Sequence, residues 1–533
     1  SEYENDDQRL RNEFYENLKN AKYKADSQKL YFLVPDKLVR QYINDVLEND
    51  GRYLESSLTS SSVSIYINDF IYLIEKLKFV DRDKEISRLE RALNDEERSR
   101  FVVIYGRRRL GKSTLIRHIL RDTDVYYMAD MTEQSQQIAM LSKIIAYKFE
   151  GFDQVIYPDW DSLIVSLKHR TTERFTLCLD EFPYMVRSNS SLLSIIQRHI
   201  DTKDLPFNLI VCGSSQQMMH SMVLDSTSPL YGRSDVVIKL EPIPITYLQE
   251  VLNLDAVQTV EEYSVWGGVP RYWELREKEK SLLSAVEYHL FDVNGTLYDE
   301  PSKLFLDDFQ HTALSSSIIS LIGNGVNRLS EIASRLQKKA TDLSNPIAKL
   351  IQLGYIEREM PFGEDVRSSK KSIYQLCDPF LRTYYKYVVP NRSLIGLGRK
   401  SLLTQIFGQT FNEFVGQYWE RLCRNAVSGN ELFGTTWNVA SRWWGNVKDG
   451  SVSRMMEVDV VAESFDKKKI LIGECKWTEK ENASRLLYEL EKKARLLPFV
   501  KDRDVVYALF LKHKPDDDIE NVILPEKILT INN

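Results

Sequence analysis

Residues 106–113 read GRRRLGKS and match the pattern GxxxxGK[ST] at every position. An apolar run, FVVIY, precedes this segment and the run STLIRHIL follows its lysine, so the expected order is strand, loop and helix. Glycines allow a backbone to wrap closely around phosphate oxygens, and a helix N-terminus adds partial positive charge. The segment therefore predicts an α/β domain whose first strand leads into a phosphate-binding loop.

The chemistry of such a loop gives roles to its last residues and to two acids further along the chain. Lys112 would reach the β- and γ-phosphates, and the Ser113 hydroxyl is a hard oxygen ligand for Mg²⁺. A second apolar strand at residues 176–179 ends in Asp180, which would hold Mg²⁺ through water, and Glu181, which would polarise the attacking water. ATP and Mg²⁺ are therefore the expected cofactors. The residues assigned to nucleotide binding are Gly106, Arg107, Arg108, Arg109, Leu110, Gly111, Lys112, Ser113, Thr114 and Asp180.

Polar residues beyond a third strand, at residues 208–212, extend this site. Ser214, Ser215 or Gln216 would lie near the γ-phosphate, between the other two strands, although a simple Gly-Ser turn fits the sequence about as well. Arg233, in the segment PLYGR, would either neutralise charge in the transition state as an arginine finger or form a structural ion pair. The sequence does not separate these two roles of Arg233.

A second group of charged residues lies near the C-terminus. Glu457 and Asp459 are two apart in an alternating strand, so both side chains are expected on one face. Glu474 and Lys476 repeat this spacing one strand later. If the strands pair, the carboxylates converge beside one ammonium, and a divalent cation relieves their repulsion. A half-buried sheet with an ordinary salt bridge is the alternative.

The spacing of these residues resembles the D…ExK signature of PD-(D/E)XK nucleases. Mg²⁺ or Mn²⁺ held by Asp459 and Glu474, with Glu420 from the preceding helix as a further ligand, would activate water for attack on a phosphodiester. Lys476 would position that water or neutralise developing charge. The order helix, strand with Asp, strand with ExK, helix and strand favours this fold over a chance match.

The composition excludes several classes of protein. The chain has 533 residues, of which 43% are hydrophobic and 28% charged, as in ordinary globular proteins of about three to five domains. Its formal net charge of −6 argues against a uniformly basic nucleic-acid coat but not against a local basic groove. The five cysteines form no CxxC pair, so a cytoplasmic location is expected, and no apolar run is long enough to predict a membrane-spanning helix.

Residues 312–376 are predicted to form three helices followed by a two-stranded hairpin, the order of a winged helix-turn-helix. The third helix carries only one basic residue, Lys349, so the module would either contact DNA phosphates through its flanks or only pack against the ATPase core. The basic residues expected to flank this helix are Arg335, Lys338 and Lys339 before it, and Arg367, Lys370 and Lys371 on the wing.

The expected fold class is a multidomain α/β protein that combines a P-loop NTPase parallel sheet, a helical lid, a winged helix and a PD-(D/E)XK, restriction-endonuclease-like domain. The expected domains are an N-terminal helical extension (1–77), the P-loop ATPase core (78–249), the helical lid (250–304), the winged helix (305–390) and the nuclease-like domain (391–533).

From about Lys78 to its end, the chain resembles the archaeal-type P-loop ATPases of the AAA+/STAND group, which also occur in bacteria and often carry a PD-(D/E)XK-like domain of unknown function. The resemblance implies ATP binding by residues 106–114, Mg²⁺ and water handling by Asp180 and Glu181, and a winged-helix module. Residues 1–77 precede the usual start of the family. The segments that carry the resemblance are KFVDRDKEISRL, YGRRRLGKST, LCLDEFPYM, VCGSSQQMM, SPLYGRSD, WGGVPRYW, YQLCDPFLRTYY, SRWWGNV, EVDVVA and LIGECKW.

The expected function is that of an ATPase controlling a metal-dependent domain that cleaves nucleic acid, in defence or mobile-element biology. Two alternatives stay open: a nucleotide-dependent switch whose nuclease-like domain is inactive and serves for docking, and a DNA-binding regulator. The expected partners are ATP, nucleic acid (DNA rather than RNA) and a second copy of the chain in a homo-oligomer, with no membrane. A metal between Asp459 and Glu474 would favour the first function.

Overall fold

The computed structural model describes residues 81–95, 97–308, 312–365, 371–450, 452–517 and 519–531. The chain divides into two units, Ser1–Val80 and Asp81–Asn533, and all of the described residues belong to the second. The helical extension expected at residues 1–77 lies outside the described residues. Among the helices of the described part, none is both long enough and apolar enough to cross a bilayer.

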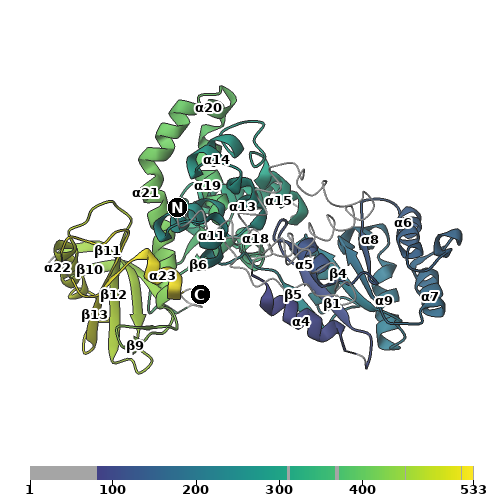
Figure 1. Cartoon of the computed structure of the whole chain (residues 1–533). Coiled ribbons are helices and arrows are strands. Elements are labelled where there is room, and N and C mark those ends of the chain that lie inside the picture. The colour runs from purple at the N-terminus through teal and green to yellow at the C-terminus, as the bar shows by residue number, and fades with distance from the viewer. Residues whose placement is uncertain are drawn as a thin grey trace, which may run out of the picture. The chain divides into compact units, whose positions relative to one another are not determined.

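The first domain is built on five strands: β1 (Phe101–Tyr105), β2 (Val125–Met128), β3 (Thr176–Asp180), β4 (Asn208–Gly213) and β5 (Val236–Lys239). They form one sheet in the order β2-β3-β4-β1-β5, and every neighbouring pair is parallel, as the alternation of strands and helices predicted (Figure 1). The strand that leads into the phosphate loop, β1, lies inside the sheet with Val103 opposite Val211 and Val237. The parallel order therefore brings the carboxyl ends of β1, β3 and β4 to one edge.

Two strands of this sheet, β2 and β5, are not apparent in the sequence. Each is four residues long and lies at an edge of the sheet, where buried and exposed positions alternate. The expected strands β1, β3 and β4 are inside the sheet and buried along nearly their whole length. A continuous apolar run marks a central strand, whereas a short edge strand leaves no such run.

Helices cover both faces of the parallel sheet. The apolar side chains of α6, α7, α8 and α9 pack in one cluster with those of β1, β3 and β4. The helices of this domain are α4 (Asp83–Leu93), α5 (Lys112–Ile119), α6 (Gln134–Ala146), α7 (Trp160–Arg170), α8 (Phe182–Ser188), α9 (Ser191–Asp201) and α10 (Gln216–Met219).

A helical region follows the sheet domain. A buried ion pair joins two of its helices, because Arg276 Nε donates to Glu262 Oε1 at 2.7 Å while the Trp266 indole donates to the other oxygen at 2.8 Å. Its helices are α11 (Ile245–Leu252), α12 (Ala256–Trp266), α13 (Pro270–Glu277), α14 (Leu282–His289) and α15 (Glu300–Asp308).

Three helices and an antiparallel hairpin come next, close to the bounds read from the sequence. In the hairpin, Ile356 lies opposite Leu376 and Glu359 opposite Ile373. Of the basic residues expected on its loop, Arg367 and Lys370 lie outside the described residues, and Lys371 donates to Glu364 at 2.6 Å. The elements are α16 (Thr312–Gly323), α17 (Leu329–Arg335), α18 (Ala340–Gln352), β6 (Ile356–Glu359) and β7 (Ile373–Leu376).

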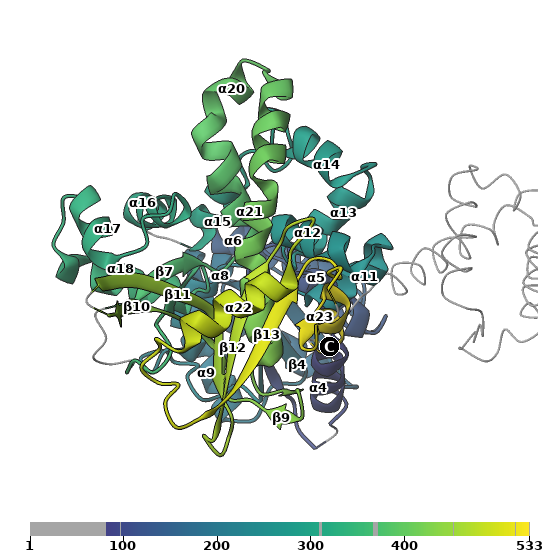
Figure 2. The same ribbon diagram turned by 90° about the vertical axis from the view of Figure 1, so that its left-hand side faces the viewer.

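The C-terminal part contains a second sheet of five strands, β10 (Ser441–Asp449), β11 (Val452–Glu463), β12 (Lys469–Lys476), β13 (Asp504–Leu511) and β14 (Val522–Ile523). The order is sequential, β10 to β12 are antiparallel, and β12 to β14 are parallel, so the sheet is mixed. Figure 2 shows α22 lying across β12 and β13. The other elements are α19 (Pro379–Thr383), α20 (Arg392–Gly396), α21 (Lys400–Val427), β8 (Glu431–Leu432), β9 (Thr435–Thr436), α22 (Ala483–Ala494) and α23 (Pro525–Ile531).

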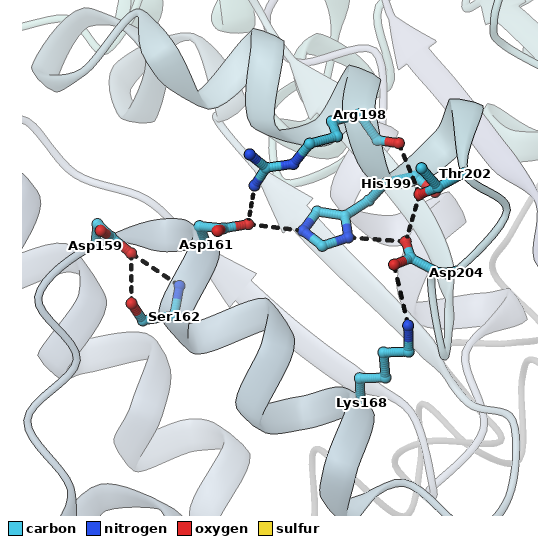
Figure 3. Close-up of polar contacts among 8 residues, drawn as sticks. All are labelled: Asp159, Asp161, Ser162, Lys168, Arg198, His199, Thr202 and Asp204. Carbon is cyan, nitrogen blue, oxygen red and sulfur yellow. Dashed lines mark hydrogen bonds and ion pairs between the residues drawn. The ribbon is translucent and has the colours of Figure 1, made fainter.

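A polar cluster ties α7 to α9 on the sheet domain (Figure 3). His199 is buried, and its two ring nitrogens lie 2.9 Å from Asp161 Oδ1 and 2.8 Å from Asp204 Oδ1. Lys168 donates to the other oxygen of Asp204 at 3.0 Å, and Arg198 pairs with Asp161. His199 and Arg198 of α9 thus both contact Asp161 of α7.

We expect Asp204→Asn to destabilise the domain. Burial tends to raise the pKa of Asp204, but hydrogen bonds from His199 and Lys168 outweigh it and hold the pKa at about 2, below the ordinary 3.8. Stability from the ionised carboxylate is therefore complete above about pH 4 and lost as the pH falls through about 2. The substitution should lower the free energy of unfolding at pH 7 by about 1–3 kcal/mol and flatten its acid dependence.

Urea titrations between pH 2 and pH 7 would measure both effects, with the exposed Asp153→Asn as the control. An acid limb that is equally steep in the Asp204 variant and in the unchanged protein would contradict the role given to this cluster.

Candidate functional site

The phosphate loop connects β1 to α5, and two of its glycines have positive φ angles. Gly106 has a φ of 154°, and a Cβ at this position would lie 2.7 Å from the backbone oxygen of Leu240, so a larger residue does not fit. Gly111 has a φ of 86° and directly precedes Lys112, the first residue of α5. The first N–H groups of a helix have no partner within it, so the start of α5 offers donors to an anion in the loop.

The Lys112 side chain folds back over the loop. Its ammonium donates to the backbone oxygens of Gly106 at 2.8 Å and Arg107 at 2.9 Å, and only 5% of the residue is exposed. A phosphate group in the loop would offer the same ammonium stronger, charged acceptors. The Lys112 ammonium therefore lies within the phosphate loop, where a bound phosphate could reach it.

Asp180 ends β3 beside the start of α5. The Ser113 hydroxyl donates to Asp180 Oδ2 at 2.8 Å, and the Tyr126 hydroxyl donates to the same oxygen at 2.6 Å. Burial and the hydrogen bond to Asp180 raise the pKa of Tyr126, so it remains a donor. A serine hydroxyl beside a carboxylate is the set of hard oxygen atoms that Mg²⁺ prefers, and the residues fit that ion. Tyr126 is a contributor that the sequence did not indicate, because β2 was not recognised.

Glu181 follows directly and faces the end of β4. The Ser214 hydroxyl donates to Glu181 Oε1 at 2.6 Å, and the Ser214 backbone N–H donates to Oε2 at 3.3 Å. Ser215 instead caps α10, and the Gln216 side chain donates to the backbone oxygen of Leu353 at 3.0 Å. Of the three polar residues considered, Ser214 is therefore the one in contact with the candidate base.

Two loop arginines turn their side chains away from the loop. Arg107 pairs with Asp378, which follows β7, and both side chains are buried. Arg109 pairs with Glu300 of α15 at 3.0 Å, and the Tyr272 hydroxyl donates to the same carboxylate at 3.2 Å. These arginines would therefore serve a bound phosphate through their backbone N–H groups, while their side chains connect the loop to α15 and to the end of the β6–β7 hairpin.

Arg233 forms an ion pair within the sheet domain. Its guanidinium donates to Asp201, the last residue of α9, through Nε at 2.8 Å and Nη2 at 3.0 Å. This geometry corresponds to the second of the two roles considered for Arg233, and an arginine finger would first have to leave Asp201.

The charged residues near the C-terminus meet where β11 and β12 pair. Val460 lies opposite Gly473, which sets Asp459 beside Glu474, and Asp459 Oδ2 accepts from the Cys475 backbone N–H at 2.9 Å. Burial and the neighbouring Glu474 carboxylate raise the pKa of Asp459. Glu457, expected in the same cluster, is instead exposed and pairs with Arg442 at 2.6 Å. Glu457 lies opposite Trp444 of β10, and its ion pair with Arg442 of the same strand keeps it out of the cluster although it has the same parity as Asp459.

Glu474 is held by two ammonium groups. Lys476 donates to its Oε1 and Lys493 of α22 to its Oε2, each at 2.8 Å. Burial works against the charged form, but the two lysines outweigh it and lower the pKa of Glu474. Lys493 was not indicated by the sequence, because it lies on a helix and belongs to no local motif.

Glu420 of α21 completes the surroundings of Asp459. Burial, followed by repulsion from Asp459, raises the pKa of Glu420 to about 7. Across the described ranges, no three His, Cys, Asp or Glu side chains are grouped as a metal ion would require. The carboxylates fit a divalent cation chemically, but binding it at Glu474 would displace at least one ammonium.

The phosphate loop, its parallel sheet and the acids at the ends of β3 define the first domain as a P-loop ATPase domain. A family model for ATPase domains predominantly from Archaea matches residues 79–274, and a model for archaeal and bacterial proteins of unknown function matches residues 384–486. The uncharacterized protein MJECL04 of Methanocaldococcus jannaschii is 30% identical over 441 residues, which are 81% of this chain and 95% of the relative. The chain belongs to the family of that protein.

Solved structures with a similar arrangement are much more distant. The ORC2 protein of Aeropyrum pernix is 13% identical, covering 61% of this chain and 96% of its own, with a TM-score of 0.38. A STAND protein of Pyrococcus horikoshii with a tetratricopeptide repeat sensor is also 13% identical, covering 65% of this chain and 49% of its own, with a TM-score of 0.28. Scores this low add nothing to the family assignment.

Proposed function

We propose that the chain binds ATP with Mg²⁺ at the phosphate loop and hydrolyses it. The observation that carries this proposal is the convergence of Lys112, Ser113, Asp180 and Glu181 at one edge of the parallel sheet, with hydrogen bonds of 2.6–3.3 Å around the two acids. A basic residue, a hydroxyl and two carboxylates in that order supply what phosphoryl transfer to water requires.

Each residue would do a separate part of the work. Lys112 would exchange its carbonyl partners for β- and γ-phosphate oxygens. Ser113 and Asp180 would hold Mg²⁺, which neutralises charge on the phosphates when bound. Glu181 would orient and polarise the attacking water, and Ser214 would keep the Glu181 carboxylate in position.

We expect Lys112→Ala to abolish ATP binding or to weaken it severely. Loss of one desolvated charge–phosphate contact should cost about 2–5 kcal/mol of binding free energy. Calorimetric titration of the full chain with ATP and Mg²⁺ measures this, and exposed Lys143→Ala on α6 is the control. An unchanged ATP affinity in the Lys112 variant would remove the loop from the proposed site.

We expect Glu181→Gln to bind ATP normally and to lose turnover. The amide keeps the shape of the side chain but cannot accept a proton from water. Ser214→Ala should reduce turnover less, because it removes only the 2.6 Å hydrogen bond that positions Glu181. Phosphate release under saturating ATP measures both variants. Full turnover by the glutamine variant would transfer the role of base to another residue.

We further propose that the C-terminal domain cleaves nucleic acid with a divalent metal, as a PD-(D/E)XK-type domain under the control of the ATPase. The proximity of Asp459, Glu474 and Lys476 on paired strands supports this second function, and Glu420 adds a carboxylate from the helix before them. DNA is the favoured substrate, since exposed Lys338 and Lys339 beside α18 offer phosphate contacts to a duplex held by a winged helix.

A docking role for this domain is the competing proposal. The two lysines on Glu474 favour it, because an ion pair of this kind is stable without a metal. In that case the nucleotide state would change the domain arrangement of a switch, and no phosphodiester would be cut.

We expect Asp459→Ala and Lys476→Ala each to abolish cleavage while ATP hydrolysis persists, because the two sites lie in separate domains. Glu457→Ala is the matched control, since this exposed carboxylate is two residues from Asp459 and outside the cluster. Cleavage of mixed DNA and RNA with Mg²⁺ or Mn²⁺, with and without ATP, is the measurement. Activity that survives both substitutions would overturn the nuclease proposal, and the absence of cleavage under every condition would favour docking.

A further inference from the structure

The β6–β7 hairpin begins and ends against the phosphate loop. Arg107 of the loop pairs with Asp378, two residues beyond β7, and its guanidinium lies 5.3 Å from the ring centroid of Tyr355, which immediately precedes β6. The Cys377 backbone N–H donates to the Tyr355 oxygen at 3.0 Å, so both ends of the hairpin are joined at this point. The partners of Arg107 are therefore the buried residues where the two ends of the hairpin meet, here called the base of the hairpin, and not an acid on the surface.

The strand end that carries Ser214 contacts the same base. The Gln216 backbone N–H donates to Asp308 Oδ1 at 2.9 Å, and the Tyr355 hydroxyl donates to Asp308 Oδ2 at 2.7 Å. The Gln216 side chain also donates to the Leu353 backbone oxygen. The phosphate loop and the end of β4 are both expected to contact the nucleotide phosphates. Both also contact the base of the β6–β7 hairpin.

The other part of the hairpin rests on the C-terminal domain. Glu357 pairs with Arg421 of α21 at 3.0 Å, and Glu359 pairs with Arg424 at 3.4 Å. Phe362, just beyond β6, donates its backbone N–H to the Arg442 oxygen at 2.9 Å and packs into the apolar core of the second sheet. The hairpin is therefore fixed at the ATPase domain at one end and at the C-terminal domain at the other.

Arg424 continues this connection to the carboxylate site. While Nη2 faces Glu359, Nη1 donates to the Asp459 backbone oxygen at 3.0 Å and lies 3.7 Å from Glu420. A set of contacts thus runs from Arg107 of the phosphate loop to Asp378, along the backbone of the paired hairpin to Glu359, and through Arg424 to the backbone oxygen of Asp459.

We propose that this set of contacts couples nucleotide binding to the C-terminal carboxylate site, an inference that rests on the proposed ATP site. The Lys112 ammonium bonds to the backbone oxygens of Gly106 and Arg107, and phosphates would compete for it. Nucleotide binding therefore changes the hydrogen bonds of the Arg107 peptide itself. Because the Arg107 side chain is buried on Asp378, the loop cannot rearrange without moving the hairpin base or breaking a buried ion pair.

Hydrogen exchange of the full chain tests the coupling. Calorimetry would first measure the affinity of the chain for a non-hydrolysable ATP analogue. Mass spectrometry would then compare the hydrogen-exchange rates of residues 356–362 and 457–461 with and without this analogue, at constant Mg²⁺. The expected result is a change in the exchange rate of both segments of about fivefold or more, as for sites with ordinary coupling energies. Arg424→Gln should keep nucleotide affinity and the change at 356–362, and lose the change at 457–461.

A matched control and a second variant separate coupling from simple packing. Lys512→Gln removes two other ion pairs of the C-terminal domain, with Glu261 of α12 at 3.1 Å and with Glu479 at 2.6 Å, and should leave both changes intact. Asp378→Asn should remove the change in both segments. Normal nucleotide affinity with no change in either segment would overturn the coupling and leave the ATP site standing. A chain that binds no nucleotide would overturn the proposed ATP site and the coupling with it.

Discussion

The buried ion pair between Arg107 and Asp378 constrains the arrangement of the domains around the phosphate loop. A guanidinium that is removed from water needs a charged partner, and breaking such a pair costs about 3–5 kcal/mol. The two residues are 271 positions apart, so the pair closes a connection across the middle of the chain. The Arg109–Glu300 pair repeats this arrangement toward α15, whose Glu300 is fully buried. The phosphate loop is thus attached to two other regions by groups that cannot be left unpaired.

The β6–β7 hairpin is held in this arrangement by two of its acids. Glu357 and Glu359 face arginines of α21, and Phe362 packs into the second sheet, so this strand is used for contacts within the protein. The proposed contact with a duplex would then depend on the turn between α17 and α18, where Lys338 and Lys339 are exposed, and on α18, where Lys349 is partly buried. This division of surfaces keeps the hairpin for contacts within the protein and leaves the exposed lysines for the DNA contact proposed above.

The features that the sequence predicted well are those encoded by neighbouring residues. The phosphate loop, the buried strands β1, β3 and β4, and the pairs Asp180–Glu181 and Glu474–Lys476 each occupy one short segment. The edge strands β2 and β5 and the strand β10 were missed, because they lack a continuous buried run. Lys493 and the Asp378 partner of Arg107 were missed for another reason: each is brought to its site only by tertiary packing. The alternation of side chains along β11 correctly predicted that Asp459 lies beside Glu474. It wrongly predicted that Glu457 belongs to the same cluster, since Glu457 pairs with Arg442.

The charge balance at the C-terminal site connects its two proposed roles. Lys476 and Lys493 neutralise Glu474, whereas Glu420 faces Arg424 at the longer distance of 3.7 Å and the Asp459 carboxylate accepts from the Cys475 backbone N–H, and the Asp459 and Glu420 carboxylates repel each other. Arg424 lies between this pair and the hairpin acid Glu359, so its position changes how strongly Asp459 and Glu420 repel. If the hairpin moves Arg424 away, the repulsion between the Asp459 and Glu420 carboxylates increases. A cation beside Asp459 would then relieve a larger repulsion. If the C-terminal site binds a metal as proposed, a hairpin held by the phosphate loop would tune the affinity of these carboxylates for it without any residue of the ATPase domain entering the site.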